Sequence, residues 1–127
     1  MLFRYWMLVI ALCLSGDLLS GQTVLDHRQQ VNLTPRAIRH IQERHWPDSP
    51  APGAGKYAPG ITVDALREMI QQAVANGRAR QNTNGRPGQI YEYDFGRPIG
   101  TRIDGGPATR LRVVVSPRNK VVTAFPF

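Results

Sequence analysis

The clearest hydrophobic pattern in the chain is a helical one that ends near residue 76. Apolar residues recur there at intervals of three and four positions, which places them on one face of a helix. They are Leu66, Met69, Ile70, Ala73 and Val74. Asn76 and Gly77 then form a stop signal, because glycine readily ends a helix. The pattern predicts a helix from about 62–64 to 76.

A shorter helix is predicted before it, over residues 35–46. Thr34 can cap its first turn, and Pro35 suits the first helical position because that position needs no N–H. Pro47 ends it. Its apolar stripe consists of Ala37, Ile38, Ile41 and Trp46. Residues 48–60 are rich in proline and glycine and are predicted to form a loop with more than a spacing role.

After Gly77 the hydrophobic period changes to two, which is typical of strands. Strands are predicted over 78–81, 89–95, 99–103, 109–116 and 120–125. The strand at 109–116 directs one set of side chains to one face and the alternate set to the other. The first set is Leu111, Val113 and Val115, and the second is Arg110, Arg112 and Val114. The expected fold is α+β, with two N-terminal helices packed on one face of a four- to five-stranded antiparallel sheet.

The N-terminus has the pattern of a secretory signal peptide. Arg4 precedes an uninterrupted apolar run over residues 7–14, and small residues follow it. We therefore expect a signal peptide at 1–21, a polar lead-in at 22–32 and a single domain at 33–127. The protein would be secreted or periplasmic, with no stable membrane insertion after cleavage, because the run is short for a bilayer. A short anchor or a misassigned start codon are the alternatives.

The net positive charge of the chain indicates which kinds of partner it can bind. The 127 residues carry a formal net charge of +7, and 14 of the 16 cationic residues are arginine. This favours anionic partners such as nucleic acid or acidic surfaces. The single cysteine, Cys13, lies in the predicted signal peptide, so the mature chain would have no disulfide and no cysteine-based metal site. No metal or other cofactor is expected.

Histidines and arginines are the candidate chemical groups. His40 and His45 are five positions apart, about 140° around a helix, which does not suit a metal pair but leaves each available for proton transfer. Arg110 and Arg112, with Thr109 and Thr123 nearby, could hold a phosphate. The plain alternatives are surface histidines and a solvated strand face. Glu92 and Asp94 are interpreted as pointing to opposite faces of their strand, so a glycosidase carboxylate pair is not expected.

Four motifs in order make the chain resemble a known family. They are H-I-x-x-R-H (residues 40–45), D-F-G-x-x-I-G (94–100), L-R-V-V-V (111–115) and V-T-A-F-P (122–126). The order resembles the C-terminal ribonuclease domains of bacterial contact-dependent and other polymorphic toxins, in the barnase–EndoU–colicin–RelE superfamily. The resemblance spans about residues 33–127. It implies metal-independent RNA cleavage on a sheet face lined by a helix-borne histidine and by arginine and threonine from the strands.

The resemblance also implies roles for individual residues. The catalytic set would be His40, His45, Arg44, Arg112, Thr123 and Thr109. RNA contacts are expected from Arg110, Tyr91 and Lys120, with the tyrosine ring stacking on an extruded base. Replacement of either histidine by alanine is expected to reduce cleavage by orders of magnitude.

The sequence therefore predicts a metal-independent endoribonuclease. The protein would be a secreted bacterial toxin that acts in the cytoplasm of a target cell. The RNA 2′-hydroxyl would attack the adjacent phosphate and leave a 2′,3′-cyclic phosphate. Transfer RNA is a candidate substrate and a cognate immunity protein a candidate partner. One alternative is a non-catalytic basic secreted module that binds nucleic acid or an acidic protein. Another is a secreted structural or inhibitor protein whose basicity is incidental.

Overall fold

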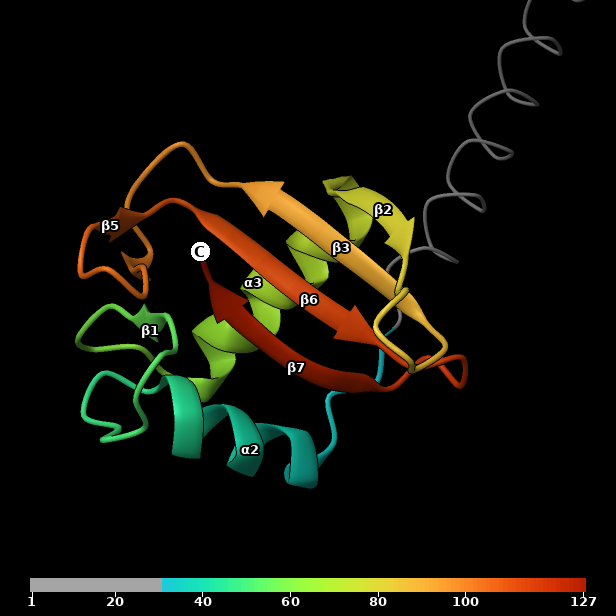
Figure 1. Ribbon diagram of the computed structural model, residues 1–127, viewed down its shortest axis with the longest axis horizontal. Coiled ribbons are helices and arrows are strands. Elements are labelled where there is room, and N and C mark those ends of the chain that lie inside the picture. Colours follow the sequence, from blue (N-terminus) through green and yellow to red (C-terminus); the bar gives the residue numbers. More distant parts are fainter. Residues whose placement is uncertain (1–30) are drawn as a thin grey trace, which may run out of the picture.

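The computed structural model describes residues 31–127, which form an α+β domain with two helices and seven strands (Figure 1). The predicted signal peptide and all but the end of the lead-in lie outside the described residues. Asn32, at that end, already belongs to the packed domain, because its amide N donates a hydrogen bond of 2.9 Å to the carbonyl of Asn119. In the part of the chain described, no helix has the length and hydropathy needed to cross a membrane.

Both helices begin at threonine caps. Helix α2 spans Pro35–His45, and Ala37 N donates to Thr34 Oγ1 at 3.2 Å. Helix α3 spans Val63–Asn76, and Ala65 N donates to Thr62 Oγ1 at 3.1 Å. Each threonine thus satisfies an amide that the helix leaves without an internal partner. The two helices differ from their predicted ranges by about one residue at an end.

Four strands form the main antiparallel sheet, in the order β2-β3-β6-β7. Their bounds are Arg78–Gln81 for β2, Gln89–Asp94 for β3, Arg110–Val115 for β6 and Val121–Pro126 for β7. A register shift between Val114 and Val115 interrupts the pairing of β6 with β7. Each of these strands lies within about two residues of a predicted one, whereas the predicted strand at 99–103 is reduced to two residues and belongs to a second sheet.

A second, smaller antiparallel sheet has the order β1-β4-β5. Its strands are only two residues long: Lys56–Tyr57 is β1, Gly100–Thr101 is β4 and Pro107–Ala108 is β5. Strand β1 lies inside the segment 48–60 that was predicted as a loop. The expectation of a single four- to five-stranded sheet was therefore wrong, because strands of two residues are too short to show alternation.

The hydrophobic core lies on one face of the main sheet. Leu111, Val113 and Val115 point into it, as the alternation predicted. In the register, Val113 is opposite Tyr91 and Ala124, which share this face. The opposite face, here called the open face, is defined by the alternate side chains of the four strands: Arg78, Arg80, Ile90, Glu92, Asp94, Arg110, Arg112, Val114, Thr123 and Phe125.

The two helices do not sit side by side on the core face. Helix α3 lies against β3 and β6, whereas α2 lies along the edge strand β7 (Figure 1). Helix α2 also reaches both sides of that edge. Its Ile41 is fully buried in the core, while its His45 stacks on Phe125 of the open face. The prediction that both helices cover one face was thus correct for α3 and only partly correct for α2.

Candidate active site

A row of directly opposed side chains crosses the open face of the main sheet. Arg78 on β2 is opposite Glu92 on β3, Glu92 is opposite Arg112 on β6, and Arg112 is opposite Phe125 on β7. Neighbouring strands lie about 4.8 Å apart, so the row spans roughly 14 Å. Helix α2 then adds His45 at the β7 end. We call this set, Arg78–Glu92–Arg112–Phe125–His45, the cross-strand row.

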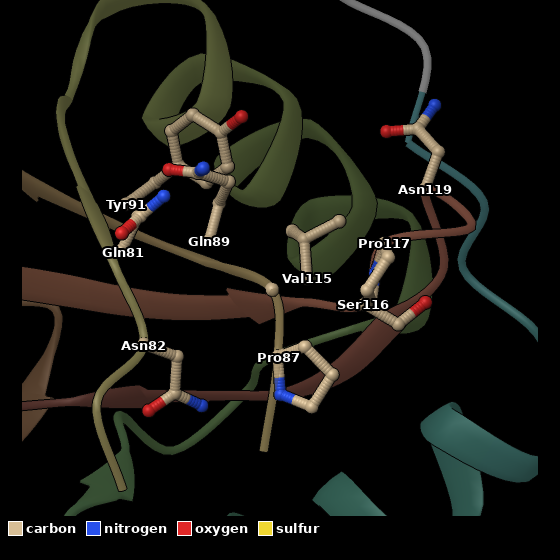
Figure 2. Close-up of a pocket in the computed structure, with 10 residues that line it drawn as sticks. Gln81, Asn82, Pro87, Gln89, Tyr91, Val115, Ser116, Pro117 and Asn119 are labelled. Carbon is tan, nitrogen blue, oxygen red and sulfur yellow. The ribbon is translucent and has the colours of Figure 1, made fainter. Parts of the chain in front are cut away.

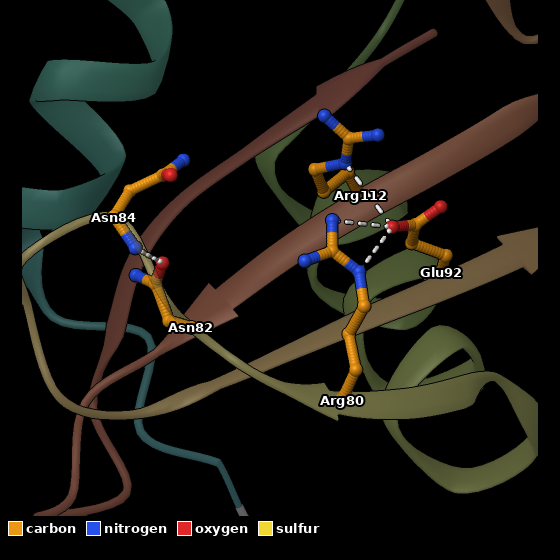
Figure 3. A network of polar contacts seen from close by, with 5 residues as sticks. All are labelled: Arg80, Asn82, Asn84, Glu92 and Arg112. Carbon is orange, nitrogen blue, oxygen red and sulfur yellow. Dashed lines mark hydrogen bonds and ion pairs between the residues drawn. The ribbon is translucent and has the colours of Figure 1, made fainter.

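Glu92 lies between two guanidinium groups near the middle of the row. Its Oε1 is 2.9 Å from Arg80 Nη2 and accepts a hydrogen bond of 3.1 Å from Arg80 Nε. The same oxygen is 3.5 Å from Arg112 Nε, an ion-pair distance at which no hydrogen bond forms. Figure 3 shows the terminal nitrogens of Arg112 turned away from Glu92. Arg112 Nε thus faces the Glu92 carboxylate as an ion pair, and its terminal nitrogens point away from that carboxylate.

Two phenylalanine rings support the arginines from β7 and the residue that follows it. Arg112 Cζ lies 4.3 Å from the centroid of Phe127 and 5.7 Å from that of Phe125. Arg110 Cζ lies 4.4 Å from the same Phe127 ring. A cation over an aromatic face is attracted by the ring quadrupole. The rings therefore restrict the positions of the two guanidinium groups. They do not neutralise the charge of these groups.

His45 is the last residue of α2 and is buried, with a relative exposure of 6%. Its ring stacks on Phe125, with 5.2 Å between centroids and 20° between planes. Its Nδ1 lies 2.9 Å from the carbonyl oxygen of Gly55. A carbonyl can only accept, so Nδ1 carries the hydrogen and Nε2 of the neutral ring has the free lone pair.

The surroundings of His45 favour its neutral form. Burial lowers the pKa of His45 below its usual value, since a charged imidazolium would lose hydration. The hydrogen bond to Gly55 opposes this shift, and the nearby cations Arg44, His40 and Lys56 add to it. Burial thus lowers the pKa of His45 and favours the neutral ring, a base whose proton lies on Nδ1.

The segment around β1 holds the histidine in place. Lys56 Nζ donates to the carbonyls of Arg44 and Ala51, both at 2.7 Å, and so ties the end of α2 to the following loop. Gly55 sits where a side chain would collide, since an added Cβ would lie 2.0 Å from the carbonyl oxygen of Pro126. The proline- and glycine-rich segment 48–60 thus has a structural role, because it delivers the carbonyl that fixes the His45 ring.

Four of the residues that the sequence predicted to be catalytic are not members of the cross-strand row. His40 and Arg44 are both exposed on α2. Thr109 lies at the junction of β5 and β6, where its carbonyl accepts a hydrogen bond from Phe95 N at 2.9 Å. Thr123 shares the open face, two positions before Phe125, and its buried Oγ1 has no hydrogen-bond partner among the described residues. Of His40 and His45, only His45 belongs to the cross-strand row, because its ring stacks on Phe125.

The residues expected to bind RNA are dispersed. Arg110 lies on the open face beside Arg112, where both contact Phe127. Tyr91 points to the core face instead and packs partly against the core. Lys120 is exposed just before β7, at the opposite end of that strand from Phe125. Only Arg110 therefore adjoins the row.

Glu92 is the main residue that the sequence interpretation missed. It lies two positions before Asp94, so both carboxylates share the open face, and the interpretation that they point to opposite faces was wrong. Asp94 is opposite Arg110 and Glu92 is opposite Arg112. The sequence did show two acidic residues in one predicted strand and two arginines with the same spacing in another. This pattern becomes informative only when the register of the two strands is known.

Among residues 31–127, no group of three or more histidine, cysteine, aspartate or glutamate side chains is placed to hold a metal ion. Comparison of the chain with protein-family models, with curated proteins and with solved structures finds no match.

Proposed function

We propose that the protein is a metal-independent endoribonuclease whose active site is the cross-strand row. The observation that carries this proposal is that His45, with its ring orientation fixed by Gly55, and the guanidinium of Arg112 both contact the same Phe125 ring. A base and a guanidinium held by one shared residue are the minimum needed to move a proton and to stabilise charge on a phosphate. RNA supplies the nucleophile itself.

The reaction uses few protein groups. His45 Nε2 accepts the proton of the 2′-hydroxyl, and the 2′-oxygen attacks the phosphorus. The P–O5′ bond breaks, the 5′-oxygen takes a proton from water, the resulting hydroxide takes the proton from His45, and a 2′,3′-cyclic phosphate remains. The lowered pKa of His45 favours the base role over the acid role at neutral pH. The proposal departs here from the expectation that both histidines are required: it gives His40 no role, because His40 is exposed on α2 and the ring that contacts Phe125 belongs to His45.

The remaining groups would hold the phosphate and its neighbours. The terminal N–H groups of Arg112 would bind the non-bridging oxygens as negative charge grows on them. The hydroxyl of Thr123 is buried without a partner on the same face, which supports a role as an oxygen-binding group once substrate is present. Arg78, Arg80 and Ala79 line a hollow of 280 Å³ beside Glu92, so adjacent phosphates could continue toward β2.

The test is digestion of total RNA by the protein in EDTA, beside the variants His45→Ala and His40→Ala. Loss of a general base usually costs about 10²–10⁴-fold, so His45→Ala should lose nearly all cleavage. His40→Ala is the matched control and should retain it. Fragments ending in 2′,3′-cyclic phosphate identify the reaction. Intact RNA after incubation with folded wild-type protein would instead favour the non-catalytic basic module, which binds RNA and does not turn over.

We further propose that the ribonuclease is a secreted bacterial toxin that is neutralised by a cognate immunity protein in its producer. Support comes from the signal-peptide pattern and the order of the four motifs. The same pair of variants tests it: wild type and His40→Ala should stop growth when expressed in the cytoplasm, and His45→Ala should not. Normal growth with wild-type protein present and folded would contradict a toxin.

A further inference from the structure

A second polar cavity lies at the far end of the main sheet from His45. Its volume is about 560 Å³, within the usual range for small-molecule sites. Two hairpin connections form it, residues 82–88 between β2 and β3 and residues 116–119 between β6 and β7 (Figure 2). The adjoining strand ends contribute Gln81, Gln89, Tyr91 and Val115.

The lining of this cavity is uncharged and mixes polar with apolar surface. It presents amide groups from Gln81, Asn82 and Gln89, together with the Tyr91 ring. No Asp, Glu, Lys or Arg side chain is among its ten lining residues, although the whole chain has 25 such residues. Side-chain amides match the paired donor and acceptor groups on the edges of nucleobases, and an aromatic ring offers a stacking surface.

Backbone contacts fix both walls. Asn82 N donates to the carbonyl of Gly88 at 3.0 Å, and Asn84 N donates to Asn82 Oδ1 at 3.1 Å (Figure 3). Gly88 has a φ of 139° and runs so close to Val115 that a Cβ there would lie 2.3 Å from the Val115 carbonyl oxygen. The cavity is thus a consequence of close packing between the two hairpins and not of a loose loop.

Cationic residues surround the cavity, in contrast to its uncharged lining. Arg86 precedes the lining residue Pro87, and Arg118 follows the lining residue Pro117; both arginines are exposed. Lys120 is exposed just before β7. A neutral polar cavity beside cations suits a ligand with an uncharged planar part joined to a phosphate.

We propose that this cavity binds an unpaired nucleobase of the RNA substrate and so contributes to the choice of cleavage site. The proposal rests on the proposed ribonuclease function for its role, but its binding chemistry can be measured without cleavage. Gln89 lies three residues from Glu92 along β3, roughly 10 Å, and points to the opposite face, so the base would belong to a nucleotide some way along the RNA from the scissile phosphate. Because Gln89 and Tyr91 point to the core face, the RNA would turn around the end of the sheet to reach them.

The test is titration of the protein with each of the four nucleoside 5′-monophosphates, followed by NMR of the backbone and side-chain amides. These ligands contain no phosphodiester bond, so no turnover can occur. We expect one base to bind more tightly than the others and to shift the side-chain amide resonances of Gln81, Asn82 or Gln89. The variant Gln89→Met keeps the side-chain length, removes the amide and should weaken that binding about tenfold or more. Gln72→Met, on the exposed side of α3, is the matched control and should bind like wild type.

Three outcomes would overturn the proposal. One is the absence of resonance shifts around the cavity with all four nucleotides. Another is equal binding of ribose 5-phosphate, which would mean that only the phosphate is recognised. The third is loss of binding in Arg112→Gln but not in Gln89→Met, which would place the nucleotide on the open face. None of these depends on cleavage, so failure of the ribonuclease proposal would be seen separately in the RNA digestion.

Discussion

The hydrogen bond between His45 Nδ1 and the Gly55 carbonyl determines which nitrogen of the ring can take part in proton transfer. Because Nδ1 is committed as a donor at 2.9 Å, only Nε2 can accept a substrate proton. Stacking on Phe125 at 5.2 Å restricts the ring plane as well. At the residue scale, His45 therefore resembles a positioned base more than a surface histidine.

The lowered pKa of His45 makes a prediction about pH. A general base must be unprotonated, so kcat/KM should rise with pH through the pKa of His45 and then stay level. Since burial lowers that pKa, the inflection should lie on the acidic side of that of an ordinary exposed histidine. Arg44→Gln removes a cation that lowers this pKa and should move the inflection upward. A pH profile of kcat/KM on a short RNA measures both, and an inflection displaced to higher pH than that of an ordinary histidine would contradict the base role.

The second residue-scale prediction concerns Glu92 as a positioning residue for Arg112. Glu92→Gln removes the charge that lies between Arg80 and Arg112, so the Arg112 guanidinium should lose its fixed position. Misplacement by about 1 Å can cost on the order of 100-fold in rate, so kcat should fall by up to that factor. The control is Asp94→Asn on the same face of β3.

The readout for Glu92 separates positioning from general damage to the fold. Thermal unfolding should be similar in the two variants, and Glu92→Asp should restore part of the activity because it restores the charge. Equal activity in Glu92→Gln and wild type would show that Arg112 needs no such partner.

At the scale of elements, the site depends on where α2 ends. The helix lies along the β7 edge, with Ile41 in the core and His45 on the open face, so a small rotation would remove the histidine from the row. The end of α2 is anchored by Lys56, which donates to the Arg44 and Ala51 carbonyls. Tyr57 adds a buried hydrogen bond of 2.7 Å from its hydroxyl to the Ala124 carbonyl, joining the small sheet to β7.

Gly55→Ala tests this anchoring. A Cβ at position 55 would lie 2.0 Å from the Pro126 carbonyl oxygen, so the segment must move and carry the His45 acceptor with it. We expect a lower melting temperature and loss of most RNA cleavage, measured by thermal unfolding and by digestion. Pro52→Ala changes an exposed residue of the same loop and serves as the control. Full activity in Gly55→Ala would show that the carbonyl does not orient the ring.

At the scale of the whole molecule, charge is distributed to suit a flexible polyanion. The open face carries four arginines, Arg78, Arg80, Arg110 and Arg112, against the carboxylates Glu92 and Asp94. The net charge of the chain is +7, so a polyanion such as the proposed RNA substrate would also be attracted at longer range. The opposite end of the sheet offers a neutral cavity instead. Binding strength and base preference would thus come from different parts of the surface.

This division predicts the salt dependence of RNA binding. In His45→Ala protein, where cleavage is stopped, affinity for single-stranded RNA should fall linearly with salt on logarithmic axes. Each arginine that neutralises a phosphate contributes about 0.7 to the slope, so Arg78→Gln and Arg80→Gln should each reduce it by roughly that amount. Arg67→Gln, at an exposed position of α3, should leave the slope unchanged. Fluorescence anisotropy at several salt concentrations measures it, and equal slopes in all variants would exclude the β2 arginines from the RNA path.

The sequence by itself determined the α+β class, both helices and the four strands of the main sheet. Each of these is recorded in local periodicity, caps and stop signals, as at Thr34, Thr62 and Gly77. It also determined which face of β6 is apolar, since alternation fixes the faces of a strand relative to each other. The four-motif order drew attention to His45, Arg112 and Thr123 before any geometry was known.

Tertiary structure decided what the motifs could not. Strand register alone placed Glu92 opposite Arg112, and the position of α2 at the β7 edge alone distinguished His45 from His40. The two-residue strands of the small sheet, and the Gly55 carbonyl beside His45, join segments far apart in the sequence. Local patterns record how a segment behaves by itself, whereas these features arise from contacts between segments, which is why they became visible only in the folded chain.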